Sequence, residues 1–331
     1  MMLTTSAEEP FSLLSPDCVA QAIESLGFYL ETEPFALNSY ENRVYLFRDD
    51  HQRRWVAKFY RPHRWSDDAI LDEHHLLASV HKAGGLVGVP WADAQGITLH
   101  HRQGHRVAIF HYVSGRAPAL DAPDDLFALG ETIGQMHLAS RSLTLPHRPV
   151  LALNTLAHQA RDIILQQAPL TESQRRSYQR ITSALLAAFQ ELALEGIRHR
   201  PLHGDCHIGN ILGDAHTGFA LVDFDDCMTG PAVQDLWMFL SGNREDERHQ
   251  QLSELIEGYE MAEAFDRRQL ALIEPLATLR MMRHAAWLIA RWRDPAFPAA
   301  FSDITCDAFW DGHLRLLEGQ LQALKRPTLW A

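Results

Sequence analysis

The chain has 331 residues, of which 46% are apolar and 22% charged, and its formal net charge is −12. This composition is that of a globular protein, and the length allows two lobes. The negative charge argues against a nucleic-acid partner, which needs a basic surface, but not against a local phosphate site. No stretch is apolar enough to cross a bilayer, so no membrane partner is expected. The first residues do not resemble a secretory signal, and four cysteines without a CxxC pair are typical of reduced cytoplasmic thiols.

The first third of the chain predicts a sheet that carries helices. Asp17 is expected to cap a helix that runs to Gly27, and Ser66 is expected to cap a second helix that ends at Gly84. Between and after these helices, apolar residues recur with the period of two that is typical of strands. Strands are therefore expected over residues 35–37, 44–47, 55–60, 87–90, 98–101 and 107–110.

The character of the sequence changes near Tyr112, and beyond it the apolar spacing is mainly helical. A short pair of strands, at residues 210–212 and 220–222, interrupts the helices. The expected fold is therefore α+β and bilobal, with a β-rich N-lobe over residues 1–112 and a mainly helical C-lobe over residues 113–331. Helices are expected over residues 125–139, 154–167, 172–195, 234–241, 249–265, 268–293 and 307–325.

A phosphoryl-transfer motif lies between Leu202 and Asp226. An Asp, an Asn five positions later, and a following strand that ends in a second Asp match a kinase catalytic loop and its Mg²⁺ ligand. Here these residues are Asp205, Asn210 and Asp223. Transfer of a γ-phosphoryl group needs a carboxylate near the acceptor hydroxyl and oxygen ligands for Mg²⁺. We therefore expect Asp205 and Asp223 to be catalytic, and Asn210 and Asp223 to bind Mg²⁺.

The ATP-binding side of the site is expected in the N-lobe. Lys58 lies in a Val-Ala-Lys string of the kind that carries the phosphate-binding lysine of a kinase, and Glu73 on the next helix is its expected partner. Strand alternation places Lys58 on the same face as Val56. The loop of residues 39–43 stands where kinases have a Gly-rich loop, yet it contains no glycine. Ser39 and backbone N–H groups are expected to contact ATP there, and a plain hairpin turn is the alternative.

Other polar residues near the motif are expected to support it or to be solvated. His203 should brace the catalytic loop by hydrogen bonds, and Asp235, at the start of an expected helix, should cap N–H groups and brace the same loop. Asp225 is expected to be solvated, with contact to a second metal ion as the alternative, and Glu41 is expected to be a simple turn residue. The His-x-Asp-x-His spacing also allows a zinc site, although the neighbouring glycines would have no role in one. For His207, a contact with the transferring phosphate and a packing role both stay open.

These residues carry a resemblance to a known superfamily. The string from His203 to Asn210, with the later string Val222-Asp223-Phe224-Asp225, resembles the aminoglycoside phosphotransferase and choline kinase superfamily, which shares the protein-kinase fold. A closer likeness, to bacterial Ser/Thr protein kinases built on that small-molecule-kinase scaffold, is carried by the strings at residues 37–45, 58–62, 230–237 and 294–298.

The resemblance implies a bilobal protein-kinase-like fold, with ATP as substrate and Mg²⁺ as cofactor. Carried over, Asp205 is the proton acceptor, Asn210 and Asp223 hold Mg²⁺, and Ser39 approaches ATP. The resemblance also implies a monomeric, cytoplasmic kinase that phosphorylates Ser/Thr hydroxyls of proteins, phosphorylates itself and acts in a stress response. Two alternatives stay open. One is a small-molecule phosphotransferase, since an acidic cleft suits cationic amino-alcohols, and the other is a catalytically silent nucleotide-binding regulator.

Overall fold

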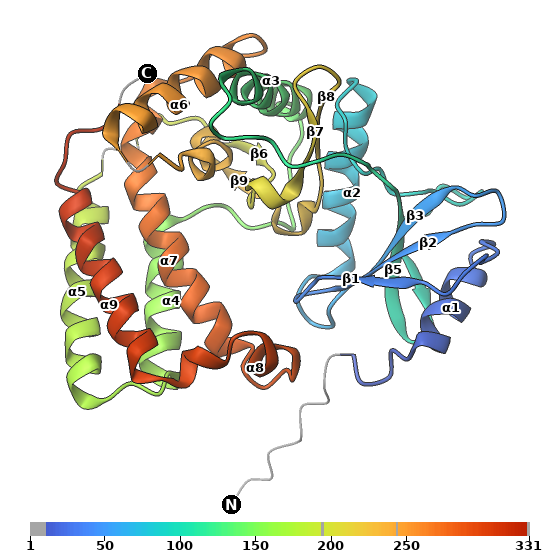
Figure 1. Cartoon of the computed structure of the whole chain (residues 1–331), viewed down its shortest axis with the longest axis horizontal. Helices are drawn as coiled ribbons and strands as arrows, with labels where there is room; N and C mark the ends of the chain where they lie inside the picture. The colour runs from blue at the N-terminus through green and yellow to red at the C-terminus, as the bar shows by residue number, and fades with distance from the viewer. Residues whose placement is uncertain (1–10, 193–194, 243, 330–331) are drawn as a thin grey trace, which may run out of the picture.

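The computed structural model describes residues 11–192, 195–242 and 244–329, and a sheet-rich first part is followed by a helical second part (Figure 1). This arrangement confirms the expected α+β fold, with a β-rich N-lobe and a mainly helical C-lobe. The last strand of the sheet ends at His111, and the next helix begins at Pro123. The lobe boundary at residue 112 stays a prediction.

The N-lobe is built on a five-stranded antiparallel sheet with the strand order β1-β2-β3-β5-β4. Alternation along β3 puts Trp55, Ala57 and Phe59 in a small core with α1 (Pro16–Glu24), and leaves Lys58 on the opposite face. The strands are β1 (Phe35–Leu37), β2 (Arg43–Arg48), β3 (Arg54–Phe59), β4 (His100–Arg102) and β5 (His105–His111).

Helix α2 (Asp67–Lys82) lies between the sheet and the C-lobe (Figure 1). The hydroxyl of Ser66 accepts a hydrogen bond from the backbone N–H of Ala69 at 3.1 Å, so Ser66 is the N-cap, as expected. Two aspartates in the first turn and a lysine in the last turn complement the helix dipole. The buried face of α2 includes Glu73, which is thereby aimed at Lys58 of β3.

The C-lobe is a set of paired helices. Helix α3 packs against α6, α4 against α7, and α5 against α9 (Figure 1). Their apolar faces form most of the larger of the two buried cores. The helices are α3 (Pro123–Ser140), α4 (Leu153–Gln167), α5 (Glu172–Gln190), α6 (Glu245–Glu260), α7 (Ile273–Ala290), α8 (Ala296–Ala300) and α9 (Asp307–Ala323).

Two short antiparallel ribbons hold the phosphoryl-transfer motif in place within the C-lobe. In the first, β7 (Ile211–Asp214) pairs with β8 (Gly218–Leu221), which confirms the strand pair expected there. In the second, β6 (Arg200–Leu202) pairs with β9 (Met228–Gly230), and this ribbon was not expected. Strands of three residues show too little periodicity to be recognised in a sequence. Together the ribbons fix both ends of the segment from Leu202 to Met228.

Two expectations in the N-lobe were wrong. The N-cap of α1 is Ser15 rather than Asp17, because Pro16 occupies the first helical position and favours a helix start there. Residues 87–90 form no strand, and only isolated bridges join Val87 to Leu221 and Pro90 to Phe110. Proline has no N–H group to donate to a strand ladder.

Three expected helices differ in type or length. The helix expected over residues 234–241 is replaced by two 3₁₀ turns, η3 (Ala232–Asp235) and η4 (Trp237–Phe239). The helix expected over 268–293 opens with the 3₁₀ turn η5 (Arg267–Leu272) before it becomes α7. The helix expected over 172–195 ends as α5 at Gln190, and residues 193–194 lie outside the described part of the chain. Within the described residues, no helix has the length and hydropathy needed to cross a membrane.

Candidate active site

A cavity of about 1080 Å³ lies between the sheet of the N-lobe and helices α4 and α7 of the C-lobe. Residues from both halves of the sequence line it together, and Lys58 and Asp223, for example, are 165 positions apart. Its lining includes every residue that the sequence assigned to ATP, metal or catalysis: Ser39, Lys58, Glu73, Asp205, Asn210 and Asp223. The two residues expected to play a supporting part, His203 and Asp235, are fully buried behind it.

The expected ion pair between Lys58 and Glu73 is present. Lys58 Nζ lies 3.0 Å from Glu73 Oε1, and both side chains are buried. Lys58 Nζ also lies 3.1 Å from Asp225 Oδ1 and 3.4 Å from Asp223 Oδ1. Burial alone would lower the pKa of Lys58, but the carboxylates of Asp225 and Glu73 outweigh this effect and raise it well above its usual value. Lys58 is therefore a fixed cation inside the cavity.

Asp225 was expected to be solvated, and this expectation was wrong, because only 3% of the residue is exposed. Besides Lys58, its carboxylate faces Arg64, whose Nη1 lies 2.8 Å from Asp225 Oδ2. Burial would raise the pKa of Asp225, but the charges of Lys58, Arg64 and Arg148 hold it well below its usual range. Both carboxylate oxygens are at ion-pair distance from these cations, yet neither accepts a hydrogen bond of good geometry from a described residue.

Hydrogen bonds of His203 and Asp235 hold the loop that contains Asp205, as expected. Asp235 accepts hydrogen bonds from the backbone N–H groups of His203 (2.8 Å) and Gly204 (2.9 Å). It does not cap its own 3₁₀ turn. Gly204 has φ +86° and lies so close to the Asp226 carbonyl that a Cβ atom would be 2.1 Å from its oxygen, so only glycine fits there. His203 donates through Nε2 to the Val222 carbonyl at 2.9 Å.

The hydrogen bonds of His203 and His207 argue against the zinc site that the His-x-Asp-x-His spacing allowed. A zinc ligand must offer a free ring nitrogen to the metal. The second ring nitrogen of His203, Nδ1, accepts the backbone N–H of Asp205 at 3.4 Å, so both nitrogens are used within the loop. Nδ1 of His207 accepts the backbone N–H of Gly209 at 3.0 Å, and its Nε2 lies 3.4 Å from Asp205 Oδ2. The spacing His-x-Asp-x-His thus serves loop geometry.

The three motif residues present oxygen atoms to the cavity. Asn210 donates through Nδ2 to the backbone carbonyl of Asp205 at 3.0 Å, which leaves its amide oxygen for another partner. Asp223 has φ 61° and ψ 67°, a left-handed conformation that is uncommon for a residue with a side chain. Its carboxylate is 58% exposed to the cavity and lies near Lys58. Strained backbone of this kind is concentrated at functional sites.

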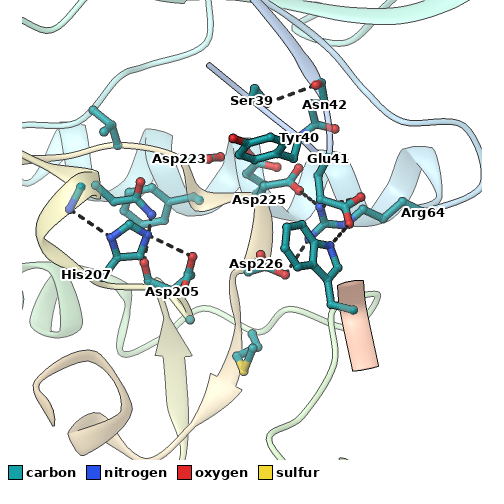
Figure 2. A pocket seen from close by; sticks show the side chains of 18 of the residues that line it. Ser39, Tyr40, Glu41, Asn42, Arg64, Asp205, His207, Asp223, Asp225 and Asp226 are labelled. Atoms are coloured by element: carbon teal, nitrogen blue, oxygen red, sulfur yellow. Dashed lines mark hydrogen bonds and ion pairs between the residues drawn. The ribbon is translucent and has the colours of Figure 1, made fainter. Parts of the chain in front are cut away.

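Asp205 lies at the C-lobe side of the cavity, beside His207, and Asp223 and Asp225 lie between it and the loop of residues 39–42 (Figure 2). An arginine of α7, Arg280, pairs through Nη1 with Asp205 Oδ1. Burial would raise the pKa of Asp205, but the bond from His207 and the charge of Arg280 hold it well below its usual range. The carboxylate is therefore ionised.

The loop of residues 39–42 is held by side chains instead of being free to move like a Gly-rich loop. The hydroxyl of Ser39 donates to the Asn42 carbonyl at 3.1 Å (Figure 2). Buried Arg61 donates to the backbone carbonyls of Glu41 (2.9 Å) and Tyr40 (3.0 Å). These bonds fix the backbone of the loop over the cavity.

Glu41 was expected to be a simple turn residue, and that expectation was wrong. It ties the N-lobe loop to α7, because its Oε1 accepts a hydrogen bond from the Trp287 indole and lies 3.0 Å from Arg291 Nε. Its Oε2 lies 3.0 Å from Arg61 Nε. The same oxygen lies 3.3 Å from Arg64 Nη1 (Figure 2). Burial would raise the pKa of Glu41, but the charges of Arg64 and Arg291 outweigh the effect and lower it.

Residues 32–273 of the chain match the family model of APH, the phosphotransferase enzyme family. The chain belongs to this family. Stress response kinase A of Salmonella paratyphi A (strain ATCC 9150 / SARB42) is 39% identical to it over 319 residues, 96% of each chain. Serine/threonine protein kinase RdoA of Salmonella typhimurium (strain LT2) is 38% identical, again over 96% of each chain. The resemblance seen in the sequence motifs is thus confirmed.

Among solved structures, the phosphotransferase is similar to amicoumacin kinase hAmiN in complex with AMP-PNP, Ca²⁺ and Ami. The two share a TM-score of 0.72 at 18% sequence identity, over 93% of this chain and 94% of the other. At that identity the likeness establishes the fold. Family membership and the kinase names of the relatives make this phosphotransferase a kinase.

Two residues of this phosphotransferase site carry no signal in the sequence. Arg148, in the loop before α4, donates to Glu73 Oε2 at 2.9 Å and to the Asp225 carbonyl at 2.5 Å, and its guanidinium is buried. Arg280, on α7, contacts Asp205 although 75 positions separate the two residues. Neither belongs to a short motif. Along α7, apolar residues alternate with arginine, but this pattern is typical of any half-exposed helix and does not single out Arg280.

Proposed function

We propose that the chain is an ATP- and Mg²⁺-dependent kinase that phosphorylates Ser and Thr hydroxyls of proteins. The observation that carries this proposal is the meeting of the Lys58–Glu73 ion pair with Asp205, Asn210 and Asp223 around one cavity. A phosphoryl-transfer site needs both sets of residues in one place, because the lysine and its glutamate position the nucleotide, whereas the aspartates and the asparagine bind the metal and the acceptor. The printed name of RdoA, a relative at 38% identity, supports protein Ser/Thr as the acceptor class.

Asn210 and Asp223 suit Mg²⁺, because the ion prefers a few oxygen ligands and keeps several waters. Asp223 offers an exposed carboxylate, and the amide oxygen of Asn210 is left over by the bond that its Nδ2 makes to Asp205. When bound, Mg²⁺ neutralises phosphate charge. The side-chain amide of Asn210 also ties the metal site to the backbone of the catalytic loop.

The N-lobe residues would position the nucleotide. Lys58, kept cationic and immobile by Glu73, faces the cavity where phosphates of ATP would lie. Arg148 holds the other oxygen of Glu73, so the glutamate cannot turn away from Lys58. Ser39, in a loop that Arg61 fixes, would lie close to the terminal phosphates. We propose the segment near residue 112 as the boundary between this ATP-binding lobe and the acceptor-binding C-lobe.

Asp205 would act as the proton acceptor. The acceptor hydroxyl oxygen forms a bond to the γ-phosphorus while the bond from that phosphorus to the bridging oxygen breaks, and ADP leaves with the electron pair. The hydroxyl proton passes to the Asp205 carboxylate. Hydrogen bonds from the loop backbone to Asp235 keep Asp205 in position for this step. From the resemblance we further propose autophosphorylation, a role in a stress response, a monomeric state and a cytoplasmic location.

The runner-up, a small-molecule phosphotransferase for cationic amino-alcohols, rested on an acidic cleft. The carboxylates of the cavity are, however, matched by cations. Each of the six acidic residues that line it lies within ion-pair distance of a lysine or an arginine: Glu41, Glu73, Asp205, Asp223, Asp225 and Asp226. This leaves little free negative charge for a cationic acceptor. The third alternative, a silent regulator, is disfavoured because Lys58, Asp205, Asn210 and Asp223 are all intact.

The experiment that tests the proposal offers the purified protein [γ-³²P]ATP with dephosphorylated cell proteins in one arm and a panel of hydroxylated metabolites in the other. Asp223→Asn serves as the matched variant that lacks a metal-binding carboxylate. We expect label on Ser and Thr residues of proteins with the wild type and a large loss with the variant. Label on a metabolite alone would favour the small-molecule alternative, and no transfer in either arm would favour the silent regulator.

A further inference from the structure

One side of the cavity is formed by α7, and this side is basic. Residues spaced three or four apart lie on one face of a helix. The face that carries Arg280 therefore also carries Arg283, His284 and Trp287, and it extends to Arg291 just beyond the end of α7. The single acidic residue of α7, Glu274, is near the opposite end and pairs with Arg248 at 2.8 Å. The charged and aromatic cavity-lining residues of this face are Arg280, Arg283, His284, Trp287 and Arg291.

The helix that packs beside α7 adds no charge to the cavity. Helix α4 packs against α7 and contributes only uncharged residues to the lining. These are Leu156, Gln159, Ala160 and Ile163. The positive charge of α7 is therefore not balanced by its nearest neighbour, and the balance must come from the catalytic loop, from the N-lobe or from a bound molecule.

Two of the three arginines already have partners of that kind. Arg280 pairs with Asp205, and Arg291 pairs with Glu41 at 3.0 Å. Arg283, three residues after Arg280, has no ion pair or side-chain hydrogen bond within residues 11–192, 195–242 and 244–329. A guanidinium that lines a cavity without a carboxylate partner can bind an anion through two parallel N–H bonds. Arg283 lies next to the residue that contacts the catalytic aspartate.

We infer that the acceptor reaches this site on an acidic peptide segment, in which a carboxylate flanking the Ser or Thr pairs with Arg283. The inference rests on the proposed protein kinase function and adds its substrate class. Complementary charge across a binding surface favours the matching partner and disfavours the opposite one. A lysine-rich segment or a cationic amino-alcohol would instead approach the unpaired guanidinium of Arg283 in a cavity whose carboxylates are already paired.

The test uses three peptides that share one central Ser and differ only in flanking Asp, Asn or Lys residues. Phosphate transfer from [γ-³²P]ATP gives kcat/KM for each peptide. We expect the Asp-flanked peptide to exceed the Asn-flanked one by about tenfold, as for a charge-assisted pair, and the Lys-flanked one to be poorest. The Arg283→Gln variant should bring the Asp-to-Asn ratio close to one. Arg293→Gln, which alters an exposed arginine beyond the end of α7 and outside the cavity lining, should keep the ratio.

A second measurement separates binding from turnover. Fluorescence anisotropy with an Asp-flanked peptide in which Ala replaces the Ser should show weaker binding to Arg283→Gln than to Arg293→Gln. Equal kcat/KM for Asp- and Asn-flanked peptides in the wild type would overturn the inference, and so would a preference that survives Arg283→Gln. A rise in the KM for ATP instead of the peptide would assign Arg283 to the nucleotide and overturn it as well.

Failure of the proposed function would look different. If no peptide is phosphorylated but a hydroxylated metabolite is, the protein kinase proposal fails, and the charge of the metabolite decides the inference. An anionic metabolite whose kcat/KM falls about tenfold with Arg283→Gln and not with Arg293→Gln would support the anion site. A cationic metabolite as the preferred acceptor would overturn both proposals.

Discussion

Arg61 of the N-lobe donates through Nη2 to Asp294 Oδ2 of the C-lobe at 2.5 Å, although 233 positions separate the two residues. Both are buried, with 4% and 7% of their surfaces exposed. Through its other N–H groups Arg61 binds the carbonyls of Tyr40 and Glu41. The aromatic ring of Tyr40 packs against Phe301 at a centroid distance of 5.0 Å. Arg61 and Tyr40 therefore connect the loop of residues 39–42 to the C-terminal segment that follows α7.

Asp294→Ala is expected to remove the ion pair between Arg61 and Asp294 and to leave Arg61 as a buried charge with one partner fewer. Removing one member of a buried pair costs about 3 kcal/mol of the free energy of unfolding. The KM for ATP should also rise several-fold, because Arg61 fixes the loop that contains Ser39. Asp121→Ala, at an exposed aspartate outside the cavity, is the matched control. A variant with unchanged denaturant midpoint and unchanged KM would show that the ion pair contributes nothing.

Asp223→Asn is expected to weaken the binding of Mg²⁺-nucleotide, because it takes a carboxylate from the proposed metal site. Isothermal titration with Mg²⁺ and a non-hydrolysable ATP analogue measures the change. The same titration with EDTA in place of Mg²⁺ is the control, and there the difference between variant and wild type should largely disappear. Unchanged affinity in the presence of Mg²⁺ would assign the metal to another ligand.

Ser39→Ala is expected to change kcat or the KM for ATP several-fold. The hydroxyl closes the loop by its bond to the Asn42 carbonyl and lies over the cavity. The free energy of unfolding should fall by no more than about 0.5 kcal/mol, the usual limit for such surface changes. Ser173→Ala, on an exposed position of α5, is the control for the substitution itself. If steady-state kinetics do not change, Ser39 is only a turn residue.

His74 predicts how stability depends on pH. Its ring is buried beside Glu73 on α2, and it bonds Tyr60 Oη at 3.0 Å and Thr98 Oγ1 at 2.8 Å. Burial, followed by the charges of Lys58 and Arg148, lowers the pKa of His74 from 6.5 to about 3. Between these values the unfolded chain binds a proton at His74 that the folded protein does not, so stability falls as the pH falls from about 6.5 towards 3.

One such proton contributes a slope of about 1.4 kcal/mol per pH unit to the free energy of unfolding. His74→Gln should reduce the slope measured between pH 6 and pH 4 by up to this amount. Urea unfolding at a series of pH values gives the slope, which is separate from any loss of stability that the lost hydrogen bonds cause. His158→Gln, at an exposed position of α4, should leave the slope nearly as it is. An unchanged slope in His74→Gln would mean that His74 is protonated in the folded protein.

Most of the candidate site could be predicted because its chemistry sits in short motifs. Asp205 and Asn210 come just before the ribbon of β7 and β8, and Asp223 comes just after it. Lys58 and Glu73 fall within one strand and the next helix. Their meeting follows from the kinase-like spacing alone. The roles of these residues remain predictions until they are tested, although the cavity contains all of them.

What the sequence could not predict depends on contacts between distant segments. Asp225 was taken as solvated because its burial comes from Arg64 and Arg148, which lie about 160 and 80 positions away in the chain. Glu41 was taken as a turn residue because its partners on α7 are about 250 positions further on. The 3₁₀ turns at residues 232–239 were taken as a helix because their apolar spacing is helical, whereas the bonds from Asp235 to the catalytic loop are long-range.

The central claim is that Asp205 accepts the proton of the acceptor hydroxyl during phosphoryl transfer. Asp205→Asn keeps the size of the side chain and the loop, but it removes the carboxylate that would take this proton. The decisive measurement is single-turnover phosphate transfer from [γ-³²P]ATP, together with the dissociation constant of Mg²⁺-nucleotide. The account predicts a rate lower by roughly 10²–10⁴ with nucleotide affinity nearly intact. A rate within a few-fold of the wild type would contradict it.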